Sequence, residues 1–289
     1  MTAQPQGFDP VQFKETTREQ WERVAEAWHR WGPTLQDWLG PVTKTMLELT
    51  HIGPGDRVLD VAAGAGEPAL SAAARVGPTG FVLATDLSAN LLGFAAQLAR
   101  ERGLGPTQFE TRTMDGEHLV LADASFDIAL SRLGLVYFPD RLGALTEMHR
   151  VLKPGGRVAI ASFTTPEANR FFSIPIGIIR RRAHLPPPPP GLPGPFSLGL
   201  QDVMEGALRQ AGFRDIQTRT IRTPLRLPST AECVRFERES FGALQQMLAG
   251  LPEAEREAAW DEIERDLRQF EGQDGFAAPT ELIVGAGTK

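Results

Sequence analysis

The strongest constraint on the fold of this chain is an alternation of short apolar runs with amphipathic stretches between residues 51 and 163. Five apolar runs predict strands, at residues 57–61, 81–85, 108–113, 126–131 and 157–163. Helical spacing predicts helices between most of them, near residues 69–75, 89–102 and 141–152. This alternation is typical of an α/β fold with a parallel sheet covered on both faces. Such sheets bind ligands beyond the carboxyl ends of their strands.

The chain before this core predicts an N-terminal helical cap over residues 1–50. Tryptophans recur there at the spacing of one helical face, at Trp21, Trp28, Trp31 and Trp38. Gly32-Pro33 interrupts the spacing, so we expect two short helices, followed by a further helix over residues 41–51. The tryptophans either attach the helices to the core or line an apolar pocket, and the sequence leaves both interpretations open.

Two more parts follow the core, which we assign to residues 51–163. Residues 164–200 predict an insertion in which Ile174-Pro175-Ile176 and the proline run 186–190 are neither helix nor central strand. The insertion is either a stiff linker or part of a lid over the strand ends. Residues 201–289 return to the core pattern, and their predicted helices and strands are 202–210, 214–222, 230–249, 252–270 and 281–284. The last strand indicates an edge hairpin added to the sheet.

Composition excludes several classes of function. A net charge of -6 argues against nucleic acid as a partner, because phosphate binding needs a concentrated basic face. A single cysteine, Cys233, excludes an intrachain disulfide and a cysteine-cluster zinc site, and we expect no metal. No stretch approaches the roughly 20 apolar residues of a membrane helix. We therefore expect a cytoplasmic protein, and the sequence leaves a homodimer open.

The segment after the first predicted strand carries the chemistry. Gly64 and Gly66 allow the backbone to turn sharply and approach a ligand, and the amides of the next helical turn can receive a carboxylate. Asp86 closes the second predicted strand, where a carboxylate can accept hydrogen bonds from both hydroxyls of a ribose. These residues predict a nucleoside-type ligand.

Taken alone, this pattern has two interpretations. Gly64-x-Gly66-x-x-Ala69 with Asp86 also fits the dinucleotide fingerprint, so an NAD(P)-dependent oxidoreductase is one alternative. Glu67 weighs against it, because a negative side chain would lie at the turn that binds a pyrophosphate.

Later motifs favour the other interpretation. They are Met114-Asp115-Gly116-Glu117, Ser125-Phe126-Asp127-Ile128, Ser131-Arg132 and Arg150-Val151-Leu152-Lys153-Pro154-Gly155-Gly156-Arg157. In this order, after Asp60 to Gly66 and Asp86, the chain resembles class I S-adenosylmethionine-dependent methyltransferases. It is most similar to the branch with the ubiquinone/menaquinone biosynthesis C-methyltransferases. The resemblance runs from about residue 47 to residue 163 and implies a Rossmann-like, seven-stranded, mostly parallel sheet.

The resemblance also implies roles for individual residues. The methionine part of the cofactor would lie against Asp60, Ala62, Gly64 and Gly66. Asp86, with Leu87 after it, would hold the ribose, and Asp115 with Gly116 would meet the adenine. Ser131 and Arg132, just past the fourth strand, would flank the cofactor near the reacting centre, and residues 153–156 would form a structural turn.

No general base is obvious in the sequence. A sulfonium methyl is already activated, so an enzyme mainly has to hold the acceptor in line with it, and a base is needed only where the acceptor must lose a proton. The candidates are His29 among the tryptophans, Tyr137 after the fourth strand and His184 in the insertion. Packing, pocket lining and a solvated basic surface are their respective alternatives.

The sequence therefore predicts a methyltransferase that uses S-adenosylmethionine and acts on carbon or oxygen of a small, largely apolar acceptor. Such an acceptor would be aromatic, quinol-like or prenylated. Besides the oxidoreductase, a second alternative is a non-catalytic cofactor-binding protein of the same fold.

Overall fold

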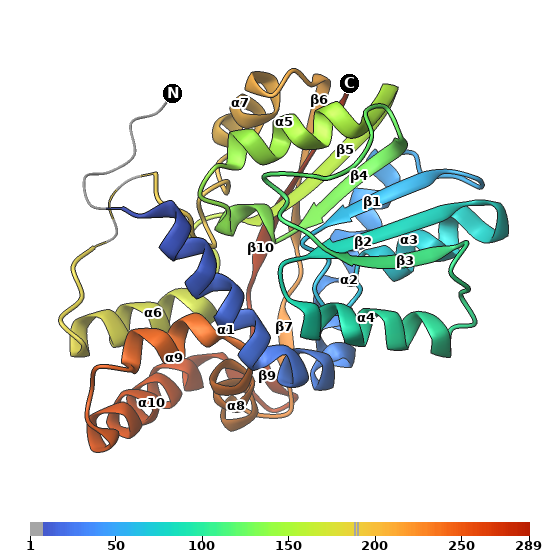
Figure 1. Cartoon of the computed structure of the whole chain (residues 1–289). Coiled ribbons are helices and arrows are strands. Elements are labelled where there is room, and N and C mark those ends of the chain that lie inside the picture. The colour runs from blue at the N-terminus through green and yellow to red at the C-terminus, as the bar shows by residue number, and fades with distance from the viewer. Residues whose placement is uncertain (1–7, 188, 190) are drawn as a thin grey trace.

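The computed structural model describes residues 8–187, 189 and 191–289, and a seven-stranded sheet runs through it (Figure 1). The sheet contains β1 (Arg57–Val61), β2 (Phe81–Asp86), β3 (Phe109–Thr113), β4 (Phe126–Arg132), β5 (Leu152–Phe163), β6 (Arg214–Arg222) and β10 (Glu281–Thr288). The strand order is β3-β2-β1-β4-β5-β10-β6, and β10 is antiparallel to both of its neighbours. The order reverses between β1 and β4, which opens a crevice at their carboxyl ends.

Helices cover both faces of this sheet. One face packs against α2 (Gly32–Leu49), α3 (Ala69–Val76) and α4 (Ala89–Glu101), and the other packs against α5 (Arg141–Val151) and α7 (Gln201–Gln210). Neighbouring strand residues alternate between the two cores, as Val58 and Leu59 do on β1. The predicted Rossmann-like fold is confirmed, since this alternation is how a sheet buried on both sides divides its side chains.

The remaining helices gather beside the carboxyl ends of the strands. They are α1 (Pro10–Arg30), α6 (Arg170–Arg182), α8 (Thr230–Ser240), α9 (Gly242–Leu248) and α10 (Glu253–Leu267). Figure 1 shows α1 passing between the sheet and the other four, and α1 contacts α4 on one side and α8 and α9 on the other. A small second sheet, which the sequence did not indicate, joins β7 (Leu225–Leu227), β9 (Gly275–Ala278) and β8 (Glu271–Gly272).

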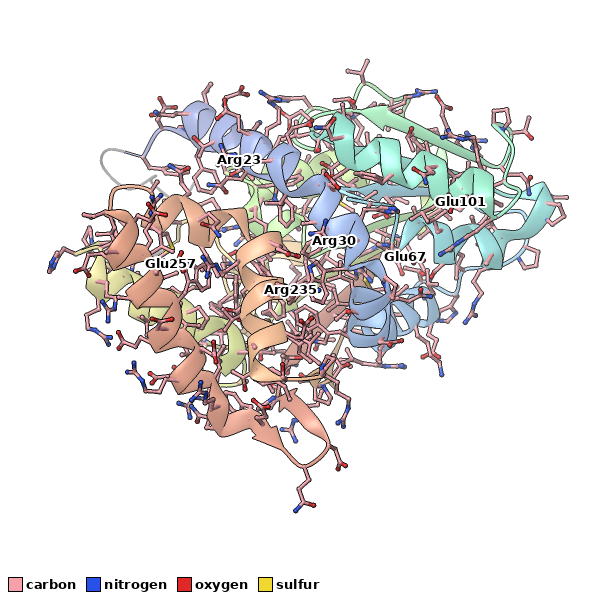
Figure 2. All side chains as sticks on the ribbon, turned by 90° about the horizontal axis from the view of Figure 1, so that it is seen from below. Arg23, Arg30, Glu67, Glu101, Arg235 and Glu257 are labelled. Atoms are coloured by element: carbon pink, nitrogen blue, oxygen red, sulfur yellow. The ribbon has the colours of Figure 1, made fainter. Side chains whose placement is uncertain are left out.

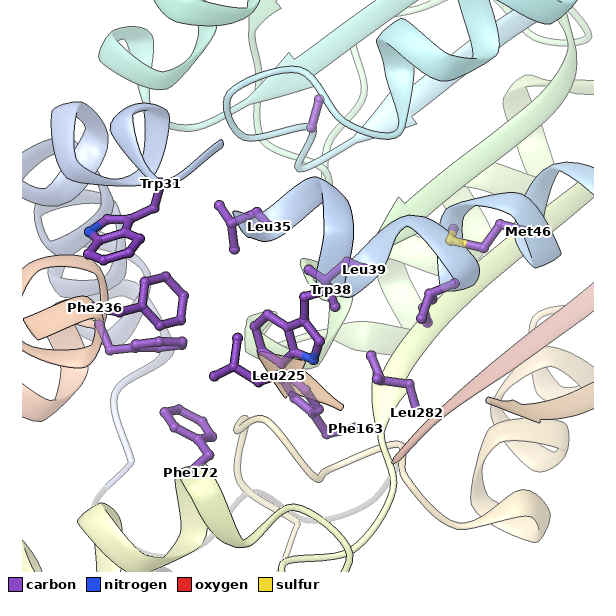
Figure 3. Packing of buried hydrophobic residues seen from close by; sticks show 14 of the residues in the cluster. Trp31, Leu35, Trp38, Leu39, Met46, Phe163, Phe172, Leu225, Phe236 and Leu282 are labelled. Atoms are coloured by element: carbon purple, nitrogen blue, oxygen red, sulfur yellow. The ribbon is translucent and has the colours of Figure 1, made fainter. Parts of the chain in front are cut away.

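An aromatic cluster fastens these helices to the end of β5 (Figure 3). Trp38 of α2 stacks on Phe163 with ring centroids 5.8 Å apart, and Trp31 meets Phe236 of α8 edge-on at 5.1 Å. The indole N–H of Trp38 donates to Thr280 Oγ1 at 2.8 Å. Burying several aromatic side chains in one cluster contributes strongly to the stability of the fold. The N-terminal and C-terminal helices therefore form one packed body.

The prediction of an irregular segment around Pro175 is wrong. The segment around it is not irregular, because α6 runs through Pro175 without a break. One backbone hydrogen bond is lost there. The helix persists because Phe171, Phe172 and Ile179 are buried along it and because Asn169, at its start, exchanges hydrogen bonds with the backbone of Glu281.

Other boundaries differ from prediction in smaller ways. The predicted helix over residues 41–51 is the second half of α2, which continues through Pro41, whereas the break at Gly32 is confirmed. The predicted helix over residues 230–249 is divided at Phe241, whose backbone leaves the helical region. β5 begins at Leu152, since residues 153–156 form an irregularity within the strand.

The division of the chain into four parts stays a prediction. Of the proline run 186–190, Pro188 and Pro190 lie outside the described residues, as do residues 1–7 of the predicted cap. In the part of the chain that the structure describes, no helix combines the length and apolarity needed to cross a bilayer.

Candidate functional site

A cavity opens at the carboxyl ends of β1, β2 and β4, where the fold predicts a ligand site. Its empty space is about 1120 Å³, including the part open to solvent. The walls come from the loop after β1, the ends of β2, β4 and β5, residues 114–117, the 3-10 turn Leu135–Tyr137, helices α1, α2 and α4, and Phe241 between α8 and α9. Segments more than 200 residues apart, such as Lys14 and Phe241, therefore meet around one space.

Asp60 lies beneath the glycine loop and is fully buried. Its Oδ2 accepts a hydrogen bond from Ala69 N–H at 2.9 Å, which caps the start of α3. Its Oδ1 is buried without a hydrogen-bond partner among the described residues. Burial raises the pKa of Asp60 well above its usual value, although Arg132 and the Ala69 amide act in the opposite direction. Because Asp60 does not line the cavity, its unpartnered oxygen can favour a cationic ligand group only through its charge.

The two glycines of the loop have different tasks. Gly64 has φ of +56°, lines the cavity and donates its N–H to Asp86 Oδ2 at 2.9 Å. Gly66 lies behind the cavity, where an added Cβ would be 2.8 Å from Leu70 and 3.2 Å from Ala95. Only Gly64 therefore faces the ligand space, and Gly66 permits the loop to pack on α3 and α4.

Asp86 is held at the end of β2 by backbone amides. Its Oδ1 accepts from Ser88 N–H at 2.8 Å, and its Oδ2 receives Gly64. Burial raises its pKa, while these amides lower it. Asp86 and Leu87, predicted for the ribose, and Ala62, predicted for the methionine part, all line the cavity, so the ends of two adjacent strands meet there.

Asp115 and Gly116 lie at another edge of the cavity, with a partner that the sequence did not indicate. Lys14 of α1 places its Nζ 2.6 Å from Asp115 Oδ2 and 2.5 Å from Glu117 Oε2. Burial lowers the pKa of Lys14, but hydrogen bonds to the two carboxylates outweigh it and raise the pKa overall. An added Cβ at Gly116 would lie 2.6 Å from Phe138 and from Val61, which explains a glycine at this point of the wall.

Ser131 and Arg132 are the last two residues of β4 and point to different surroundings. Ser131 is fully buried behind the cavity, and its Oγ accepts from Leu135 N–H at 3.2 Å. Arg132 lines the cavity and donates to Thr43 Oγ1 at 2.7 Å and to the Glu67 carbonyl at 3.1 Å. Of this predicted pair, only Arg132 can touch a ligand directly.

The other half of the cavity is aromatic and apolar. Its walls are Trp21, Trp28, Trp38, Leu39, Leu133, Tyr137, Phe138, Phe163 and Phe241. Trp31 does not take part, because its ring packs on Phe236 and its N–H donates to Glu239. Both interpretations of the tryptophans therefore apply: Trp31 attaches the helices, Trp21 and Trp28 line the cavity, and Trp38 does both.

The three candidate bases are not brought together. Tyr137 lines the cavity, edge-on to Trp21 at 6.3 Å, and burial raises the pKa of its hydroxyl. His29 stacks on Phe94 at 4.3 Å and borders a separate cavity behind the glycine loop. His184 follows the end of α6 and is exposed. None of the described residues of the insertion lines the main cavity.

Comparisons with known proteins add a family to this geometry. Residues 59–160 match the family described as Methyltransferase domain. Nocamycin O-methyltransferase from Saccharothrix syringae is 30% identical over 205 residues, which cover 67% of this chain and 72% of that protein. This chain belongs to the S-adenosylmethionine-dependent methyltransferase family. Family membership favours S-adenosylmethionine over the dinucleotide that the glycine pattern alone allowed.

A second methyltransferase, an uncharacterised protein and a solved structure are also similar to this chain. A ubiquinone/menaquinone biosynthesis C-methyltransferase from Ectopseudomonas mendocina is 34% identical over 55% of this chain and 64% of its own length. An uncharacterised protein of Mycobacterium tuberculosis is 38% identical over 126 residues, and this chain spans 43% of its length. Among solved structures, the [4+2]-cyclase SpnF is 21% identical with a TM-score of 0.54, covering 92% of this chain and 96% of that one. That likeness shows a shared fold.

The cavity of this methyltransferase suits its cofactor. Asp60 is buried beneath the loop and does not line the cavity, so its unpartnered oxygen would attract the ammonium of the methionine part by charge rather than by contact. The carboxylate of Asp86 lines the cavity and could receive the ribose hydroxyls. An added Cβ at Gly134 would lie 2.3 Å from Ala62, so this side of the cavity also depends on a glycine to stay open.

Proposed function

We propose that this methyltransferase transfers the methyl group of S-adenosylmethionine to carbon or oxygen of a small, largely apolar acceptor. The acceptor is aromatic, quinol-like or prenylated. One observation carries the proposal, namely a single cavity whose one half presents backbone-held carboxylates and whose other half presents aromatic rings. A polar nucleoside and an apolar molecule can therefore meet without either leaving its preferred surroundings.

The cofactor supplies an activated methyl group, and the protein residues bind and orient around it. Asp86 binds the ribose, and Asp115 accepts from the adenine side while Lys14 balances its charge. The rings of Trp21, Phe163 and Phe241 hold the acceptor by apolar contact and exclude water from the reacting centre.

Tyr137 contributes a protonated hydroxyl rather than a base. Because burial raises its pKa, it keeps its proton at neutral pH and can donate or accept a hydrogen bond or offer its ring, but it does not take up a proton. The acceptor must then lose its proton to solvent or arrive ionised, which suits phenols and quinols. Accordingly, Tyr137→Phe should leave the pH dependence of the rate unchanged, and loss of the rise in rate with increasing pH would identify Tyr137 as the base.

The relatives support this acceptor class. The names of two similar proteins refer to ubiquinone/menaquinone and to 2-phytyl-1,4-naphtoquinone, and a third refers to nocamycin. We infer a small-molecule partner and no nucleic acid, while the cytoplasmic location and a homodimer stay predictions. So does a lid formed by residues 164–200.

Methyl transfer tests the proposal directly. The full chain would be incubated with tritiated S-adenosylmethionine and with a 2-prenyl-1,4-naphthoquinol, an apolar phenol or phosphoethanolamine. Label should move to an apolar aromatic compound and not to the charged amine. Transfer to phosphoethanolamine alone would contradict the acceptor class.

Binding separates the alternatives. Calorimetry should show saturable binding of S-adenosylhomocysteine and none of NADH. NADH binding in its place would favour the oxidoreductase. Tight S-adenosylhomocysteine binding without transfer to any apolar acceptor would favour a non-catalytic cofactor-binding protein.

A further inference from the structure

Trp28 of α1 presents its indole nitrogen to the glycine loop. A Cβ added at Gly64 would lie 3.7 Å from Trp28 Nε1, so the N–H edge of the ring borders the one loop glycine that faces the cavity. Trp21 packs edge-on to the ring at 5.1 Å and Phe241 does so at 6.1 Å. Two perpendicular aromatic contacts fix the direction in which the N–H points.

This N–H differs from those of the neighbouring tryptophans. Trp31 Nε1 donates to Glu239 Oε2 and Trp38 Nε1 donates to Thr280 Oγ1, each at 2.8 Å. Trp28 Nε1 has no acceptor among the described residues, although it borders the ligand space. An indole N–H in such surroundings usually finds a partner, so its missing acceptor is expected on a ligand.

A cation lies at the same end of the cavity. Trp28, Glu67 and Arg132 line both the main cavity and the cavity behind the loop. The second cavity is also lined by Arg30 and Glu101, which are labelled in Figure 2. Arg132 has five N–H donors, and acceptors among the described residues take only two of them. Its guanidinium stays charged in proteins even though burial lowers its pKa.

We propose that the indole N–H of Trp28 donates to the carboxylate of the cofactor's amino-acid tail, with Arg132 providing the opposite charge. A neutral donor beside a guanidinium matches a carboxylate, because charge-assisted hydrogen bonds to that group are short and strong. The adenine end of the cavity has the reverse character, with Asp115 and Glu117. This proposal rests on the proposed function and identifies Trp28 as a positioning residue for the cofactor.

The test compares two ligands that differ only at the tail. S-adenosylhomocysteine carries the amino acid, whereas 5′-methylthioadenosine keeps the nucleoside thioether and lacks it. Calorimetry would measure both ligands on the wild type, on Trp28→Phe and on Trp31→Phe. Trp31 is the matched control, because it lies three residues along the chain and its indole N–H donates to Glu239, but it does not line the cavity.

Trp28→Phe should lower the affinity for S-adenosylhomocysteine by about 10-fold, which is the effect of losing one hydrogen bond to a charged group. Its affinity for 5′-methylthioadenosine should stay within about 2-fold of that of the wild type. Trp31→Phe should change neither affinity by more than about 2-fold. Equal weakening of both ligands in Trp28→Phe would overturn the proposal by reducing Trp28 to wall packing, and no weakening would also overturn it. Absence of S-adenosylhomocysteine binding in the wild type would instead contradict the proposed function. Retained 5′-methylthioadenosine binding shows that the variant is folded.

Discussion

The two halves of the cavity are built in different ways. The cofactor half uses short local segments at strand ends, and its carboxylates are held by backbone amides, as Asp86 is by Gly64 and Ser88. The acceptor half uses side chains from α1, α2, the end of β5 and Phe241 between α8 and α9, which meet only by helix packing. Backbone hydrogen bonds fix position to a fraction of an ångström, whereas apolar packing tolerates substitution. This difference is compatible with a family of enzymes that share one cofactor and differ in their acceptors.

Removing the carboxylate of Asp86 should have the largest effect. Asp86→Ala removes an acceptor of ribose hydroxyls and also releases the loop at Gly64. We expect S-adenosylhomocysteine affinity to fall by on the order of 100-fold, which calorimetry would measure. Glu110→Ala on the neighbouring strand is the control, since that carboxylate pairs with Arg112 on the surface. Equal losses in both variants would remove the distinction between the halves.

A change in the aromatic half should affect binding of the acceptor but not binding of the cofactor. Phe163→Leu reduces the ring wall without opening the whole core, and we expect the acceptor KM to rise by about 10-fold, as for a lost apolar contact of about 1–2 kcal/mol. Affinity for S-adenosylhomocysteine should stay within about 2-fold. Phe270→Leu, whose ring packs on Phe276 and does not line the cavity, should change neither. A rise in cofactor Kd equal to the rise in acceptor KM would show that the halves are not independent.

Lys14 joins the helical cap to the cofactor half and should have a moderate effect. Lys14→Met leaves Asp115 and the mostly buried Glu117 without their cation, so α1 should dock less firmly. Because the pair is partly solvated, we expect affinity for S-adenosylhomocysteine to fall by only about 3- to 5-fold, with faster proteolysis within α1. Lys44→Met removes an exposed pair with Glu48 and provides the comparison. Unchanged affinity and proteolysis would show that Lys14 does not connect the halves.

Glu237 should affect stability and not the site. Burial raises the pKa of this carboxyl well above 4.5, and its Oε2 has no partner among the described residues. The folded chain therefore holds the proton more tightly, and this advantage, complete below pH 4.5, is lost as the pH rises through the raised value. Glu237→Gln cannot ionise, so its free energy of unfolding should fall less than that of the wild type between pH 5 and pH 9. Denaturant unfolding at both values measures this, and parallel declines would contradict the prediction.

The cofactor half could largely be predicted from the sequence. Gly64 and Asp86 follow apolar runs directly, and the ends of adjacent parallel strands must meet at one edge of the sheet. Gly66 and Ser131 lie beside the cavity but behind its wall, and the sequence did not distinguish such residues from those that face the cavity. That distinction depends on the direction of each side chain after the loop has folded.

Tertiary structure alone decided the rest. The contact between Lys14 and Asp115 spans 101 residues, and its existence depends on where α1 docks. The same docking places Trp28 at the loop, whereas Trp31, three residues later, lies in the aromatic core. The spacing of residues along the chain determined the strands and the glycine loop, because these features are local. The cofactor followed from the order of the later motifs and the family that they resemble. Which helix faces close the cavity was decided by the packing of distant segments, whose side chains are neighbours only in the folded chain.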